Sequence, residues 1–219
     1  MFSVEPLKFK HPFTCMMAGP SQSGKSTLLA KILTYNKVMI TPQPDCILYC
    51  YSRWSDGFNQ LKYLSPTIEF KQGLPEIETL NVENNNLLIL DDLMSEAEKS
   101  RAMLELFTTD SHHANISVFL ISQNLFSQGK FSRTISLNCQ YMIVFNNPRD
   151  KAQIHALSRQ MYPTNPPFLI ECYEDATSTK FGYLFLDLTQ STDNQNRVQT
   201  GITPNDERII YQPKKSVSN

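Results

Sequence analysis

The chain has 219 residues, 41% of them hydrophobic and 19% charged, and a formal net charge of −1. Its length suits one α/β domain with a substantial core and is too short for two full domains. The near-neutral charge gives no support for nucleic-acid binding through a global basic field, and no apolar stretch approaches the roughly 20 residues of a membrane span. The composition is therefore that of a soluble globular protein.

Short apolar runs alternate with amphipathic segments along the chain, and their order predicts the secondary structure. In the first half we predict strands at 13–18, 46–51 and 87–90, a helix at 25–35, and a short helix with an edge segment within 57–81. In the second half we predict helices at 95–107 and 149–161 and strands at 116–121, 142–145 and 181–188. Ser95 and Glu98 have the spacing of a capping box for the first of these two helices.

This alternation predicts an α/β fold with a mostly parallel central sheet and helices on both of its faces. We assign residues 1–190 to a single domain. Residues 191–219 are rich in polar residues and proline, and we predict a loosely ordered C-terminal tail there.

Residues 19–26 match the complete phosphate-binding pattern G-x-x-x-x-G-K-[ST] and directly follow the strand predicted at 13–18. A strand that ends in such a loop and runs into a helix lets backbone N–H groups surround a polyphosphate. Lys25 would reach the β- and γ-phosphates, and the Ser26 hydroxyl would join the Mg²⁺ shell. The predicted nucleotide-binding residues are Gly19, Pro20, Ser21, Gln22, Ser23, Gly24, Lys25, Ser26 and Thr27. We therefore predict a P-loop NTPase that binds ATP and Mg²⁺.

Two acids, Asp91 and Asp92, end the apolar run 87–90. In a P-loop protein a carboxylate at the tip of a neighbouring strand holds Mg²⁺, and we assign this role to Asp91. The next acid, Asp92, is placed to orient or deprotonate an attacking water. Without the phosphate-binding loop, a solvated turn would be the default interpretation of these two residues.

A polar amide follows the strand predicted at 116–121. Gln123 is our candidate to hydrogen-bond the γ-phosphate or the lytic water, and the alternative is an amide that caps the following turn. His112 and His113 precede this strand. No Cys or acid stands at ligand spacing from them, so we do not predict a metal site there.

Two arginines are candidates to complete the catalytic site from a neighbouring subunit. Arg133 lies in a segment that follows Gly129, and Arg149 follows the strand predicted at 142–145. Either could act in trans as an arginine finger, and each is also consistent with an ordinary surface residue.

The segments Gly-Pro-Ser-Gln-Ser-Gly-Lys-Ser-Thr, Leu-Leu-Ile-Leu-Asp-Asp-Leu-Met, Ser-His-His-Ala-Asn-Ile-Ser-Val and Ser-Gln-Asn-Leu-Phe resemble those of viral genome-packaging ATPases. These belong to the poxvirus-like branch of the FtsK–HerA superfamily, and the versions in Polinton/Maverick elements and adintoviruses are the most similar. There, Arg-Thr-Ile-Ser-Leu-Asn, Phe-Asn-Asn-Pro-Arg-Asp-Lys and Phe-Gly-Tyr-Leu-Phe-Leu-Asp-Leu also find counterparts. The resemblance covers about residues 10–190.

The resemblance implies an additional-strand ATPase core, assembly into a homo-oligomeric ring, and ATP-driven movement of double-stranded DNA into a preformed capsid. It also implies a capsid or portal protein as a partner. Lys25 and Ser26 match the phosphate and Mg²⁺ positions, Asp91 the magnesium acid and Gln123 the strand-tip sensor. The superfamily usually has Glu after the magnesium Asp, whereas this chain has Asp92, whose shorter side chain puts its role as water activator in doubt.

Two other hypotheses stay open. A small nucleoside or nucleotide kinase shares the loop and the size but usually carries an Arg-rich lid, and we find no comparable Arg cluster after the middle strands. The other is an ATP-gated assembly factor with little turnover, against which the intact Lys25, Ser26 and Asp91 argue.

The location expected of the chain follows from its N-terminus. Residues 1–10 lack a basic-then-apolar secretory pattern, so we expect an intracellular chain with no membrane partner. With the resemblance, this means the host nucleus or a viral assembly site, with transient residence on the capsid.

Overall fold

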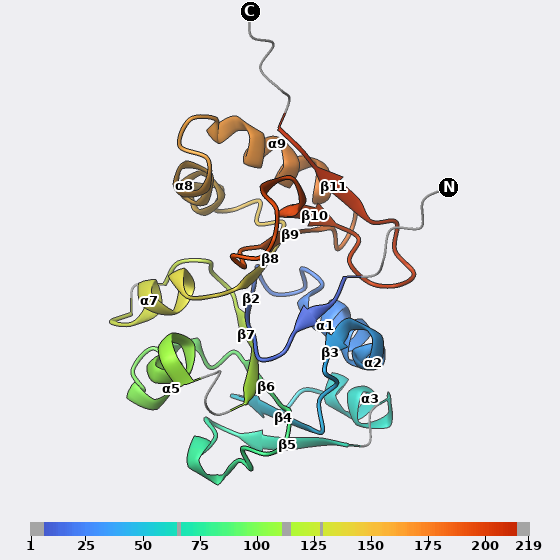
Figure 1. Cartoon of the computed structure of the whole chain (residues 1–219), viewed down its shortest axis with the longest axis vertical. Helices are drawn as coiled ribbons and strands as arrows, with labels where there is room; N and C mark the ends of the chain where they lie inside the picture. The colour runs from blue at the N-terminus through green and yellow to red at the C-terminus, as the bar shows by residue number, and fades with distance from the viewer. Residues whose placement is uncertain (1–6, 65–66, 111–114, 128, 214–219) are drawn as a thin grey trace, which may run out of the picture.

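A nine-stranded sheet runs through the middle of the part of the chain that the structure, a computed structural model, describes: residues 7–64, 67–110, 115–127 and 129–213 (Figure 1). The strand order is β11-β10-β9-β8-β2-β7-β6-β4-β5. Its strands are β2 (Thr14–Ala18), β4 (Cys46–Tyr51), β5 (Ile68–Gln72), β6 (Asn86–Asp91), β7 (Ile116–Ser122), β8 (Tyr141–Phe145), β9 (Tyr183–Asp187), β10 (Val198–Thr200) and β11 (Ile209–Tyr211). A separate parallel pair joins β1 (Phe9–Lys10) to β3 (Ile40–Thr41).

The six strands from β8 to β5 are parallel, and β9, β10 and β11 extend the sheet in antiparallel pairing. The predicted α/β fold with a mostly parallel sheet is therefore confirmed. Strand β7 lies between β2 and β6. The strand that precedes the glycine-rich loop and the strand that ends in two acids are thus separated by one strand. This order fits the additional-strand core that the resemblance implies.

Helices cover both faces of the sheet (Figure 1). They are α1 (Lys25–Thr34), α2 (Asn36–Met39) and α3 (Gly57–Leu64) on one face, and α4 (Met94–Ala97), α5 (Arg101–Glu105), α7 (Ser132–Leu137), α8 (Ala152–Met161) and α9 (Pro166–Ala176) on the other. Short 3₁₀ turns lie at Ile77–Thr79 and Asn194–Asn196, and a π-helical turn at Leu106–Asp110.

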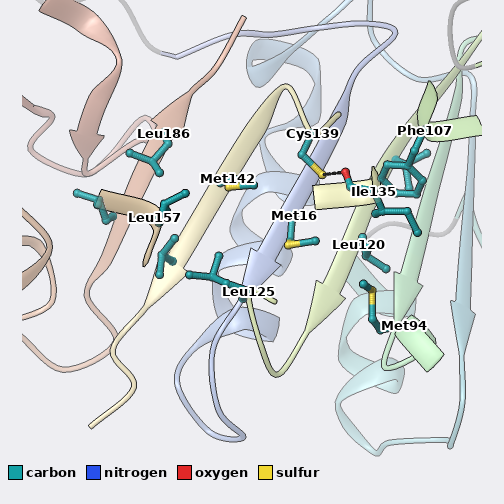
Figure 2. Packing of buried hydrophobic residues seen from close by; sticks show 14 of the residues in the cluster. Met16, Met94, Phe107, Leu120, Leu125, Ile135, Cys139, Met142, Leu157 and Leu186 are labelled. Carbon is teal, nitrogen blue, oxygen red and sulfur yellow. Dashed lines mark hydrogen bonds between the residues drawn. The ribbon is translucent and has the colours of Figure 1, made fainter. Parts of the chain in front are cut away.

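Alternate residues of each strand supply the two hydrophobic cores, because successive side chains of a strand point to opposite faces. Met16, Leu120 and Met142 belong to the core beneath α5, α7 and α8, which Figure 2 shows. Their neighbours Met17 and Ile121 belong to the core beneath α1 and α3. Each such side chain contributes roughly 1.5–3 kcal/mol on full burial. This two-sided burial holds the strand ends, and the loops that follow them, in fixed positions.

The helix predicted at 95–107 is wrong as a continuous element. The chain forms α4 and α5 instead, and the capping box does not form, because the Ser95 hydroxyl donates to Glu96. Glu98 is buried and accepts a hydrogen bond from the Ser127 hydroxyl. The N-cap of α5 is Ser100, whose hydroxyl accepts a hydrogen bond from the Met103 N–H at 3.3 Å. The segment is thus divided between Ala97 and Arg101, where α4 ends and Ser100 caps α5.

The helix predicted at 149–161 begins later, at Ala152. The side-chain oxygen of Asn147 accepts hydrogen bonds from the backbone N–H groups of Arg149 and Asp150, each at 3.2 Å. The Asp150 carboxylate then accepts from the Ala152 N–H at 3.1 Å. These side-chain bonds hold 147–150 as a turn, since Asn and Asp compete with the helix for backbone donors.

The last predicted strand and the predicted tail also need correction. Phe181 has a φ of 64° and lies outside β9, which begins at Tyr183. Residues 198–211 do not form a loose tail, because β10 and β11 join the sheet and Val198 and Ile202 are buried.

The helices α7 and α9 lie in segments for which the sequence pattern predicted none. Among the described residues, no helix has the length and apolar character to span a membrane.

Candidate nucleotide-binding site

The predicted phosphate-binding loop connects β2 to α1 and adopts a conformation that requires its two glycines. Gly24 has a φ of 109°, which L side chains rarely adopt, and a Cβ there would lie 2.9 Å from the Cβ of Phe181. A Cβ on Gly19 would lie 2.7 Å from the Cβ of Phe145. A side chain at either position would therefore clash with Phe145 or Phe181 and displace the loop.

The ammonium of Lys25 is held over the loop by backbone carbonyls. It donates to the carbonyl oxygens of Gly19 at 2.5 Å and Pro20 at 2.8 Å. Burial lowers the pKa of Lys25, and the nearby carboxylates of Asp91 and Asp92 oppose this effect. A half-buried cation is thus placed in the concavity of the loop, where a polyphosphate would supply the negative charge.

The buried hydroxyl of Ser23 makes no hydrogen bond within the described residues. A buried polar atom without a partner is costly, and such an atom often marks a place for a bound group. The exposed hydroxyls of Ser26 and Thr27 lie in the first turn of α1, whose N-terminus favours anions. The donors of this loop therefore fit a phosphate chain.

One open pocket of about 570 Å³ brings the loop together with the ends of β6 and β7. This follows from the topology, because the carboxyl ends of parallel strands meet at one edge of the sheet. The pocket is lined by Ser21, Gln22, Gly24, Lys25, Ser26, Thr27, Ser55, Asp91, Asp92, Ile121, Ser122, Gln123 and Phe181. We call it the phosphate pocket.

The carboxylate of Asp91 is oriented by a buried tyrosine. Tyr49, on the neighbouring strand β4, donates its hydroxyl to Asp91 Oδ2 at 2.6 Å. Burial raises the pKa of Asp91, and Asp92 raises it further, while the Tyr49 hydrogen bond and Lys25 lower it. One carboxylate oxygen is thus fixed by the phenol, and the carboxylate faces the same pocket as Ser26 and Lys25.

Asp92 and Gln123 are paired at the rim of the phosphate pocket. The Gln123 amide donates to Asp92 Oδ1 at 3.4 Å, and both side chains are exposed. Asp92 has a φ of 56°, so the chain turns sharply directly after β6. The pairing joins Asp92, predicted to act on the attacking water, to Gln123, predicted to contact the γ-phosphate or that water.

The segment after Gln123 is tied to the turn at 147–150 through Gln153 of α8. Gln153 Oε1 accepts from the backbone N–H of Leu125 at 2.6 Å. Its amide nitrogen donates to Asp150 Oδ2 at 2.7 Å and to Asn124 Oδ1 at 3.2 Å. This side chain therefore couples the loop beyond the amide at position 123 to the turn that carries Arg149.

Arg133 and Arg149 do not line the phosphate pocket of their own chain. Arg133 lies on α7 and Arg149 on the 147–150 turn, and both side chains are exposed. Both side chains are therefore accessible to a neighbouring molecule. His112 and His113 lie outside the described residues.

The sequence did not predict several residues of the site: Tyr49, which orients Asp91 from behind the pocket, and Ser55, Ile121, Ser122 and Phe181, which line it. A tyrosine within the apolar run 46–51 is a usable signal, because a buried phenol requires a hydrogen-bond partner. Ser55 and Phe181 carry no such local signal. Their positions depend on how the segments after β4 and before β9 approach the loop.

The metal-binding capacity of the pocket rests on few protein ligands. No group of three or more His, Cys, Asp or Glu able to hold a metal ion occurs in the part of the chain that the structure describes. Mg²⁺ is usually bound through one or two carboxylates together with substrate phosphates and water. The donor set of Asp91 and Ser26 fits that manner of binding.

Comparisons with known proteins give similarity at the level of structure. No family model and no curated protein matches the sequence. The genome-packaging NTPase B204 of Sulfolobus turreted icosahedral virus 2, in complex with sulfate, is similar with a TM-score of 0.55 and 12% identity over 92% of this chain and 97% of that one. The AMP complex of the same NTPase has a TM-score of 0.51 and 15% identity over 83% of this chain and 95% of that one. Its ATP-γS complex has a TM-score of 0.50 and 13% identity over 92% of this chain and 98% of that one. The chain therefore has the fold of a P-loop NTPase.

Proposed function

We propose that this chain is the ATP-hydrolysing subunit of a motor that moves double-stranded DNA into a preformed viral capsid. The observation that carries the proposal is the convergence of Lys25, Asp91 and Gln123 on one pocket behind a phosphate-binding loop. The likeness of fold to a genome-packaging NTPase over nearly the whole of both chains supports it further. Because the two sequences are only 12% identical, this similarity supports the fold, and the proposed function rests on the residues of the site.

In the proposed binding step, the backbone N–H groups of the loop and the Lys25 ammonium receive the β- and γ-phosphates of ATP. Asp91 and Ser26 are the residues that would hold Mg²⁺, which when bound neutralises charge on the phosphate oxygens. Tyr49 fixes the Asp91 carboxylate by its hydrogen bond, so that this group does not have to be ordered when the nucleotide arrives.

In the proposed hydrolytic step, Asp92 and Gln123 position a water in line with the γ-phosphorus. Asp92 accepts hydrogen bonds and can take a proton from that water, whereas the Gln123 amide can donate to a phosphate oxygen. Their pairing at 3.4 Å keeps both groups on the same side of the pocket. Because Asp has a shorter side chain than Glu, we assign positioning of the water to the two residues together.

We propose that a ring of copies completes the site, with Arg133 or Arg149 of one subunit reaching the phosphates bound by the next. An arginine finger is worth about 10³–10⁵ in rate where one exists. Both side chains are exposed and available to a neighbour. Arg149 has the additional feature that its turn is tied through Gln153 to the loop beyond Gln123.

The hydrogen bonds of Gln153 suggest how ATP hydrolysis would be transmitted from the phosphate pocket to the turn that carries Arg149. Loss of the γ-phosphate removes the group that the Gln123 amide contacts, and the loop behind it is bonded to Gln153. Gln153 is in turn bonded to Asp150, so a shift of the loop would displace the turn that carries Arg149. DNA backbone contacts made by such a ring should be insensitive to sequence and weaken with salt.

The proposal includes partners and a location that follow from the same function. A packaging motor assembles with a portal or capsid protein and resides transiently on the capsid, in the host nucleus or at a viral assembly site.

The test is ATP hydrolysis by the purified chain with and without double-stranded DNA. We expect DNA to raise the rate and a nucleoside acceptor to have no effect. Stoichiometric phosphorylation of an added nucleoside would overturn the proposal in favour of a kinase. Tight ATP binding with turnover that DNA does not raise would favour an ATP-gated assembly factor.

A further inference from the structure

A second hollow, of about 560 Å³, adjoins the phosphate pocket. The two share Gly24, Thr27 and Phe181 in their walls. The second hollow therefore begins where the phosphate-binding loop enters α1 and continues toward the C-terminal part of the chain. A linear ligand with its phosphates in the first pocket would have its other end at this junction.

Phe181 stands at the junction of the two hollows. Its side chain is 50% exposed, although a large aromatic ring normally gains by burial. Its backbone has a φ of 64°, an uncommon conformation for a bulky residue, and its Cβ lies over Gly24. The ammonium of Lys180 lies 5.0 Å from the ring centroid. The fold thus holds an aromatic ring, partly open to solvent, directly beside the loop.

The far wall of the second hollow comes from the turn 201–207 between β10 and β11. A Cβ on Gly201 would lie 2.0 Å from the Glu207 carbonyl oxygen, so the two ends of the turn are in close contact. The Ile202 N–H donates to the Tyr183 hydroxyl at 2.9 Å, and Asp206 accepts from the Thr203 hydroxyl at 2.7 Å. The turn is therefore a formed surface before any ligand arrives.

Helix α1 anchors the same turn. Lys31 of α1 donates to Asp206 Oδ1 at 3.2 Å, and Asn205 donates to the Tyr35 hydroxyl at 2.6 Å. The residues that follow the phosphate-binding loop in sequence are thus attached to the C-terminal turn in space. This attachment fixes the distance between the phosphate pocket and the far wall of the second hollow.

We propose that this second hollow holds the nucleoside of the bound triphosphate, with the base stacked on Phe181 and the ribose facing the wall formed by residues 200–207. The inference rests on the proposed function and assigns a binding site to the nucleoside half of the same ligand. Aromatic side chains stack on any base, and the side-chain oxygens of Thr200, Asp206 and Glu207 are acceptors suited to ribose hydroxyls.

A second exposed ring, Trp54, precedes Ser55 of the phosphate pocket and is the alternative stacking partner for the base. Trp54 is 48% exposed, and its ring contacts Tyr51 and Phe70, with centroids 5.4 and 5.7 Å away. Trp54 lines neither hollow. The geometry therefore favours Phe181 as the ring that meets the base.

The experiment compares binding of MgATP with binding of magnesium tripolyphosphate, which has the phosphates without a nucleoside, by calorimetry on the full chain. Phe181→Ala should weaken MgATP binding by roughly 5- to 150-fold, the range that one base–aromatic stack supplies. The same variant should weaken tripolyphosphate binding far less than MgATP binding, because the Phe181 Cβ that lies against Gly24 is retained. Phe181→Trp should restore MgATP binding. Tyr63→Ala removes an 86% exposed ring from outside both hollows and should change neither affinity.

Failure of this inference and failure of the proposed function give different results. If Phe181→Ala binds MgATP like the wild type, the nucleoside assignment is overturned while nucleotide binding stands. If the wild type binds neither MgATP nor tripolyphosphate, the proposed function itself fails.

A second measurement does not depend on any variant. Irradiation of the wild type with 8-azido-ATP should label peptides within 175–183 or 200–211, because the azide is attached to the base. Labelling confined to 52–58 would place the base beside Trp54 and overturn the proposal.

Discussion

The phosphate pocket and the second hollow lie side by side but are built in different ways. The phosphate pocket is lined mainly by one continuous segment, 19–27, and by the tips of adjacent parallel strands, with Ser55 and Phe181 as the contributions from elsewhere. The second hollow uses Phe181, which precedes β9, and the 201–207 turn, which depends on antiparallel pairing of β9, β10 and β11. The chemistry of a contiguous loop can be recognised from its sequence, whereas that of a wall assembled from distant segments cannot.

The largest expected effect concerns the phosphate pocket. Lys25→Ala should lower the ATP turnover number by at least about 10²–10³-fold, because it removes the charge that stabilises the transferring phosphoryl group. Turnover is measured by phosphate release, with circular dichroism to verify the fold. Lys62→Ala removes an exposed lysine of α3 and is the matched control. Undiminished turnover in Lys25→Ala would rule out the assigned site.

The next effect concerns the C-terminal strands that build the second hollow. Ile202 is 1% exposed, so Ile202→Ala should lower the free energy of unfolding by about 2–5 kcal/mol. Ile209→Ala, at a residue 42% exposed, should change it by no more than about 0.5 kcal/mol. Urea denaturation measures both. Equal small effects would mean that residues 198–211 are loosely attached in solution.

A smaller effect sharpens the assignment of Asp91. Tyr49→Phe removes the hydroxyl that orients this carboxylate and should weaken Mg²⁺ activation of turnover about 10- to 100-fold. A magnesium titration at saturating ATP measures the change. Tyr51→Phe removes a hydroxyl from the same strand and should leave the titration unchanged. A normal titration for Tyr49→Phe would show that this hydrogen bond has a structural role alone.

The smallest effect concerns the connection between the pocket and the Arg149 turn. Gln153→Leu removes the acceptor of the Leu125 N–H and the donor to Asp150. It should lower stability by about 1–3 kcal/mol, the cost of leaving a buried donor unsatisfied. Because Gln153 couples the two loops, the variant should also lose DNA stimulation of turnover more than basal turnover. A proportional loss of both would argue for a purely local role.

Much of the fold followed from apolar runs whose bounds agree with the strands to within one or two residues. The strand at 46–51 and the run that ends at Asp91 are of this kind. Errors arose where side chains make hydrogen bonds that hydrophobic periodicity does not encode. Glu98 bonds Ser127, which is distant in sequence, and Asn147 accepts from two backbone N–H groups of its own turn.

The sequence by itself predicted the glycine-rich loop at 19–26, the acid pair and the mostly parallel character of the central sheet, because glycine spacing and hydrophobic alternation are local properties. Only the tertiary structure decided that Tyr49 orients Asp91, that Phe181 lies against Gly24, and that residues 198–211 extend the sheet. Those contacts join segments far apart along the chain, and their free energy comes from packing and pairing that exist only once the sheet has formed.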